Sequence, residues 1–161
     1  MTLRLRPRLP HLCALALAAL LAHTAQAQEA TPAPAPGLQA PADDSLFREL
    51  GGKPGIDRLV AEFVPRLMAD EHLSEFFKHA RQDRFKPHLA QLLCVLSGGG
   101  CAYEGAPVAE AHRDMDISRA DFNAVVRVLQ DAMDAQHVPF ATQNRLLARL
   151  APLHRDIVST H

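Results

Sequence analysis

The sequence predicts an all-α fold, and three features indicate that class. Apolar residues recur at spacings of three and four over most of residues 44–161, which is the period of one helix face. Glycine or proline stands where several of these stretches begin or end, as at helix termini. The sequence contains no alternating apolar–polar stretch typical of a half-buried strand, and no internal repeat.

Residues 1–27 have the pattern of a secretory signal peptide. Three arginines lie within the first eight residues, and the apolar stretch 12–22 follows. That stretch is short for a helix that spans a bilayer, so a membrane anchor is the less favoured alternative. The small-x-small site Ala25-Gln26-Ala27 predicts cleavage after Ala27. We therefore expect an exported, periplasmic protein without stable membrane insertion after cleavage.

The charge of the mature chain argues against polyanionic partners. Residues 1–27 hold three of the 17 Lys and Arg and none of the 18 Asp and Glu, which leaves 14 basic against 18 acidic residues, or −4. No basic run is present. Nucleic acid and anionic membranes are therefore not expected as partners.

Residues 28–43, QEATPAPAPGLQAPAD, alternate Pro and Ala and contain almost nothing large and apolar. Such a segment cannot form a packed core, so we expect a disordered, extended tether. A leftover of export with no role is the alternative. The folded domain is expected over 44–161.

The first half of the domain begins with a short helix that Asp44 and Ser45 can cap and that Gly51-Gly52 ends. An amphipathic helix over 56–68 follows, in which Pro65 should cause a distortion. A short segment over 73–77 leads to a helix face over 85–96, which the triple glycine 98–100 ends.

Three more helices are predicted in the second half. A short one over 108–113 starts near Pro107, a favourable first-turn residue. Ser118 caps a long one with apolar residues through Met133, and the last runs from about Thr142 to Val158.

Two cysteines remain after cleavage, because Cys13 lies in the signal segment. An even pair in an oxidising compartment predicts a disulfide between Cys94 and Cys101. Seven residues of straight helix would hold their Cα atoms about 10.5 Å apart, beyond the bridging limit of about 7 Å. The chain must therefore turn at the glycines between them. Two reduced, buried cysteines are the alternative.

Two histidines stand out by position. His112 shares the inward face of its short helix with Val108 and Ala109, and His88 lies one turn after Phe85. Imidazoles on separate helices could bind an iron from opposite sides. From spacing alone, a core histidine with a satisfied hydrogen bond remains the default interpretation. H-E-x-x-H, G-x-S-x-G, C-x-x-C-H and EF-hand patterns are absent from the sequence.

Residues 45–161 resemble the group I (N-type) truncated haemoglobins. The segments that carry the resemblance are Ser45-Leu46-Phe47, Leu50-Gly51-Gly52, FVPRLMADEHLSEFF (63–77) and GGGCAYEGAPVAEAHRDMDIS (98–118), with Phe122 after them. The resemblance implies a two-over-two helical sandwich around haem b. It also implies that His112 is the proximal iron ligand, that Phe77 packs on the porphyrin and that Phe122 belongs to the haem site.

The distal positions depart from the family pattern. Val64 stands where the family usually has an oxygen-stabilising tyrosine, and Leu89 where many relatives have a glutamine. Phe85 matches the distal gate. His88 matches a position where some cyanobacterial relatives have a sixth iron ligand; contact with a propionate or water is the alternative.

The resemblance implies a globin that reversibly binds oxygen, nitric oxide or carbon monoxide. Two alternatives are a redox module with iron bound by His112 and His88, which would need a redox partner, and an enzyme with nitric oxide dioxygenase or peroxidase-like activity. The apolar distal positions weaken the dioxygenase alternative, because bound oxygen gains stability from a hydrogen-bond donor.

Overall fold

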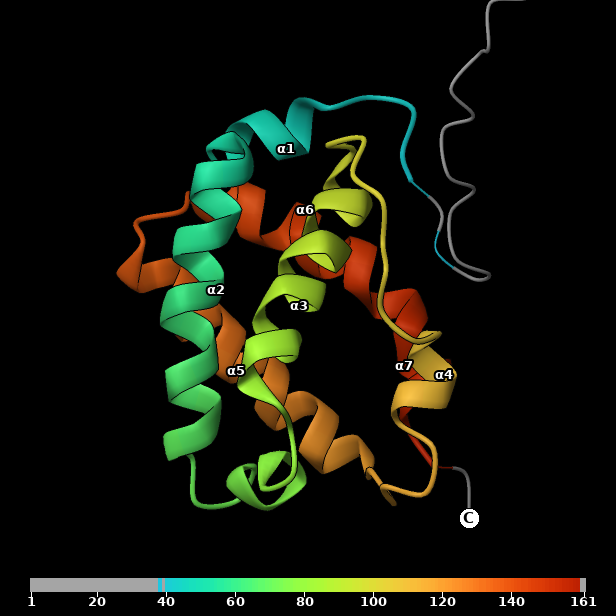
Figure 1. The fold of residues 1–161 in the computed structure, drawn as a ribbon. Helices are drawn as coiled ribbons and strands as arrows, with labels where there is room; N and C mark the ends of the chain where they lie inside the picture. Colours follow the sequence, from blue (N-terminus) through green and yellow to red (C-terminus); the bar gives the residue numbers. More distant parts are fainter. Residues whose placement is uncertain (1–37, 39, 160–161) are drawn as a thin grey trace, which may run out of the picture. The chain divides into compact units, whose positions relative to one another are not determined.

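The computed structural model describes Leu38 and residues 40–159, and within that part it is helical, with no strand (Figure 1). The predicted signal peptide and most of the predicted tether lie outside the described residues. The elements in chain order are α1 (Ser45–Glu49), α2 (Gly52–Ala69), η1 (Ser74–Phe77), α3 (Gln82–Ser97), α4 (Val108–Ala111), α5 (Arg119–Ala135), α6 (Phe140–Leu150), η2 (Ala151–Leu153) and α7 (His154–Ile157).

Two predicted helices differ in detail from the structure. The last one is divided into α6, η2 and α7, and Pro152 lies in η2. Because proline has no backbone N–H to donate, it favours this tighter turn over a continuous α-helix. Conversely, α2 continues through Pro65 to Ala69.

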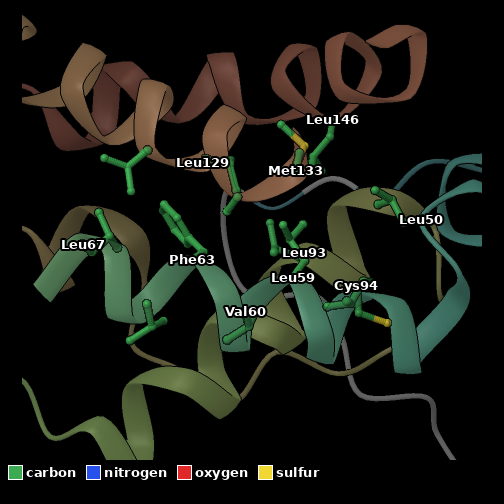
Figure 2. Close-up of a cluster of buried hydrophobic side chains, with 14 of the residues drawn as sticks. Leu50, Leu59, Val60, Phe63, Leu67, Leu93, Cys94, Leu129, Met133 and Leu146 are labelled. Atoms are coloured by element: carbon green, nitrogen blue, oxygen red, sulfur yellow. The ribbon is translucent and has the colours of Figure 1, made fainter. Parts of the chain in front are cut away.

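The long helices form two layers. Figure 1 shows α2 and α3 in front of α5 and α6, and α2 packs against both α3 and α5. The main core lies between these layers. Figure 2 shows Leu59 and Phe63 of α2 together with Leu129 and Met133 of α5 and Leu146 of α6. The two-over-two sandwich expected from the sequence is therefore confirmed.

Close backbone approach at the top of α2 and α3 requires glycine. A Cβ on Gly55 would lie 1.8 Å from the carbonyl oxygen of Leu50, which belongs to the chain between α1 and α2. Gly98 ends α3 with φ +90°, and a Cβ there would lie 2.1 Å from the Asp43 oxygen. Any side chain at either position would force α1 or the segment before it away.

The turn required by the predicted disulfide is present. After α3 the chain reverses at the glycines, and the structure joins Cys94 and Cys101 by a disulfide with Cα atoms 5.8 Å apart.

The chain before α1 also packs on the domain. Leu38, inside the segment predicted as tether, is 4% exposed and belongs to a small cluster with Val95, Leu96, Val108 and Leu153.

Helix α5 begins with a capping box. Ser118 accepts from the Asp121 backbone N–H and its own N–H donates to Asp121 Oδ2 at 2.8 Å. The Ser118 hydroxyl also donates to Oδ2, and the His72 ring contacts Oδ1. These hydrogen bonds, led by the Ser118 side chain, hold the pKa of the Asp121 carboxyl below its ordinary value of 3.8.

Replacing Asp121 with asparagine should lower the free energy of unfolding by about 1 kcal/mol at neutral pH, the usual value of an N-terminal cap. Because the pKa is lowered in the folded state, the charge stabilises the protein above pH 3.8 and this contribution is lost as pH falls through the folded pKa. Urea unfolding at pH 7 and at a series of pH values below 3.8 should show a difference that is full at pH 7 and shrinks as the pH falls. Asp131→Asn, on the exposed face of α5, is the matched control. A difference in the free energy of unfolding that stays constant as the pH falls below 3.8 would contradict this account.

Candidate functional site

A cavity of about 340 Å³ opens between α3, α4, α5 and the C-terminal helices. Its volume lies in the range of small-molecule sites. Of the side chains that line it, only those of His88, Tyr103, His112 and Asp121 carry polar groups. The cavity therefore fits a largely apolar ligand with very few directional contacts.

Several large apolar residues are half-buried because they face this cavity. They come from η1, α3 and α5: Phe76, Phe77, Phe85, Leu89, Leu92, Phe122, Val125 and Val126. The rings of Phe77 and Phe85 lie 5.4 Å apart at its edge. An apolar ligand would remove much of this surface from water, and each 100 Å² so buried contributes about 2.5 kcal/mol. The lining thus fits a planar apolar group such as a porphyrin.

His112 is held at the end of α4 with one ring nitrogen fixed. Its Nδ1 lies 2.7 Å from the carbonyl oxygen of Val108, one turn earlier. A carbonyl only accepts, so Nδ1 is the donor, and in the neutral ring the lone pair is on Nε2. A histidine whose other nitrogen is bound in this way is oriented as a metal ligand. The His112 ring lines the cavity and is half-buried.

The opposing polar groups are His88 of α3 and Tyr103 of the following loop. Their ring centroids lie 6.4 Å apart in an edge arrangement. The Tyr103 hydroxyl donates to the Ala106 carbonyl at 3.0 Å, and burial raises its pKa, so it keeps its proton at neutral pH. Because that proton is used within the loop, His88 is the cavity residue best able to donate to a ligand.

The structure brings most of the sequence-predicted site residues together. Phe77, Phe85, His88, Leu89, His112 and Phe122 all line the cavity. Val64 does not: it is fully buried in the main core. Successive helical residues point about 100° apart, and here Phe63 and Leu67 line the cavity while Val64 lies on the other face with Val60.

Several lining residues were not singled out from the sequence as site residues. The cavity is closed from the turn after α4, the end of α6, η2 and α7 by Met115, Ile117, Leu150, Leu153 and Ile157. The spacing of Leu150, Leu153 and Ile157 predicted an inward face, but a core face and a cavity face give the same pattern. Met115 and Ile117 lie in a turn and belong to no periodic stretch.

The chain resembles known proteins over most of its helical part. The family model described as bacterial-like globin matches residues 45–159. The group 1 truncated hemoglobin GlbN of Mycolicibacterium paratuberculosis is 32% identical over 115 residues, which cover 71% of this chain and 85% of that protein.

Solved structures show the same fold. The truncated hemoglobin from Tetrahymena pyriformis in its Fe(III) form superposes with a TM-score of 0.69 at 25% identity, covering 71% of this chain and 98% of that one. Chlamydomonas reinhardtii THB1 gives 0.63 at 25% identity, covering 74% and 100%. Within the part that the structure describes, no helix is long and apolar enough to cross a membrane.

Proposed function

The chain belongs to the bacterial-like globin family as a haem-binding group 1 truncated haemoglobin, and from this premise we propose that it reversibly binds a diatomic gas at a haem b iron held by His112. The observation that carries the proposal is the His112 ring, which faces an apolar cavity with Nδ1 occupied by Val108 and Nε2 available. When bound, haem supplies the iron at which oxygen, nitric oxide or carbon monoxide binds.

The protein's own residues have three roles in this proposal. His112 would anchor the iron from the α4 side, and the Val108 carbonyl would keep its ring in one tautomer. Phe77 and Phe85 would cover the porphyrin edge and exclude water. On the opposite side Leu89 offers no hydrogen bond and His88 is the side chain best able to donate one. The pocket would therefore bind nitric oxide and carbon monoxide well and retain oxygen less strongly than a pocket with a second donor at position 89.

The test is the absorption spectrum of the purified protein titrated with hemin, in ferric and ferrous forms. A saturable Soret band at one haem per chain, shifted by carbon monoxide in the ferrous form, is the expected result. Failure to bind hemin would remove the proposed function and leave the fold.

A second candidate is a redox module with His88 as sixth iron ligand. It is supported by the position of His88, which lines the same cavity as His112 and has no hydrogen bond within residues 40–159. This candidate predicts a low-spin ferric spectrum that becomes high-spin in His88→Ala and does not change in His79→Ala, whose side chain is exposed outside the cavity. A high-spin spectrum in the unmodified protein would exclude this candidate and leave an open distal position.

We also propose that the protein is exported to the periplasm by the segment 1–27, in keeping with its basic opening, apolar stretch and Ala25-Gln26-Ala27 site. The expected result is a periplasmic protein whose N-terminal residue is Gln28. Recovery of uncleaved chain from the cytoplasm would contradict it.

A further inference from the structure

The loop that joins α3 to α4 is attached to α3 at two places. The Cys94–Cys101 disulfide is the first. The second is a pair of hydrogen bonds, in which the Gln91 amide donates to Glu104 at 3.0 Å and accepts from the Glu104 backbone N–H at 3.1 Å. Figure 1 shows this loop, in yellow, running back alongside α3 until it reaches α4. The disulfide therefore fixes the start of the chain segment that joins the two helices.

This loop contributes to the proposed haem site. Tyr103 and Ala106 belong to the loop and line the cavity, and α4, which follows, has His112 as its C-cap. Cys101 and Tyr103 also pack against the small cluster that contains Val108, the first residue of α4 and the partner of His112. A change in the position of the loop would thus displace both Tyr103 and His112, which line the proposed haem site.

The disulfide faces a second cavity, of about 400 Å³, between α2 and α3. Both half-cystines line it, and none of its lining residues lines the proposed haem site. Cys94 is 2% exposed, whereas Cys101 is only half-buried. Cys101 is therefore the more accessible of the two residues to a molecule in this cavity.

The charged residues of this cavity favour an anion. Lys53, Asp57 and Lys86 line it, and Lys53 is paired with Asp57 at 2.8 Å. Lys86 is half-buried and has no ion pair within the part of the chain that the structure describes. The remaining lining is mostly apolar, which suits a small ligand with one charged end.

We propose that this cavity is a thiol–disulfide exchange site for small anionic thiols, and that reduction there loosens the loop and weakens haem retention. The second half of the proposal rests on the proposed haem function. The first half is independent of haem.

The cystine is reduced in two thiol–disulfide exchange steps. The thiolate of one small molecule attacks Cys101 Sγ, which breaks the bond to Cys94 and forms a mixed disulfide with Cys101. Cys94 leaves as a thiolate and takes a proton from solvent. A second small thiol attacks the mixed disulfide, releases Cys101 as a thiol and forms the oxidised small-molecule disulfide. Two electrons pass to the protein cystine, and two small thiols are oxidised.

The first experiment measures the exchange itself on the full chain carrying Cys13→Ser, so that two protein thiols report the reaction. The probes are 3-mercaptopropionate and the neutral 2-mercaptoethanol, compared at equal thiolate concentration under native conditions. We expect mercaptopropionate to react faster and Lys86→Gln to reduce that preference about twofold, as expected for one partly solvated charge. Lys78→Gln, outside the cavity and paired with Glu75, is the matched control.

Equal rates for the two thiols in all variants would overturn the anion-binding role of the cavity. A disulfide that reacts only after denaturation would overturn the exchange site altogether.

The second experiment measures haem transfer to an excess of an apo-globin acceptor, before and after reduction. We expect reduction to speed haem loss by about tenfold, because the cross-link no longer restrains the loop. The double variant Cys94→Ser/Cys101→Ser should lose haem at the fast rate without any thiol, and added thiol should not change it, which controls for reduction of the iron. Identical rates for the oxidised, reduced and double-serine proteins would overturn the coupling. Absence of a Soret band in every form would instead reject the haem function, while the thiol kinetics would still decide the exchange site.

Discussion

His112→Ala is expected to abolish stable haem incorporation. Of the two histidines that line the cavity, His112 is the one whose Nδ1 is fixed by a backbone carbonyl, which leaves Nε2 as the oriented iron ligand. Removing the ring also leaves a gap in the α4 wall, and the Val108 oxygen loses its side-chain partner. The measurement is the haem content of the purified variant, read from the Soret band per chain, together with a hemin titration of the apoprotein.

Two controls separate loss of the ligand from loss of the fold. The far-ultraviolet circular dichroism of the variant should remain that of a helical protein, because His112 follows α4 and none of the long helices contains it. Added imidazole should restore part of the Soret band by occupying the gap. Normal haem content in His112→Ala without imidazole would remove His112 from the proposed site and leave His88 as the candidate ligand.

Leu89→Gln is expected to slow the dissociation of oxygen from the haem-loaded ferrous protein by about tenfold. Leu89 lines the cavity on the same helix as Phe85 and His88 and is half-buried, so a glutamine there can reach the ligand without cutting into the main core. One hydrogen bond contributes up to about 1.5 kcal/mol, which corresponds to roughly a tenfold change in rate. Stopped-flow displacement of oxygen by carbon monoxide measures it.

The matched control is Leu89→Met, which conserves volume and supplies no donor. The methionine variant should lose oxygen at the same rate as the unmodified protein, and its ferrous iron should oxidise at the same rate. If the glutamine and methionine variants behave alike, the apolar character of position 89 does not determine oxygen retention, and His88 becomes the candidate donor.

The helices could be predicted from the sequence because they depend on local patterns of residues. The three-and-four spacing in α2 and α5, the Ser118 cap and the glycines after α3 act over a few residues, and the structure contains each of them. The same local reasoning missed Leu38, since one leucine among prolines and alanines gives no periodic signal. Its burial depends on Val95, Leu96, Val108 and Leu153, which lie far along the chain.

The sequence by itself determined the all-α class, the order of the helices, the family and the pair His112 and His88 as candidate ligands. Only the tertiary structure decided which inward-facing residues pack in the core and which line the cavity, as Val64 and Phe63 show. It also decided that the Tyr103 hydroxyl is bound to Ala106 and that both half-cystines face a second cavity. The physical reason is that helix periodicity records which face avoids water. Whether that face meets another side chain or an open space is set by segments distant in sequence.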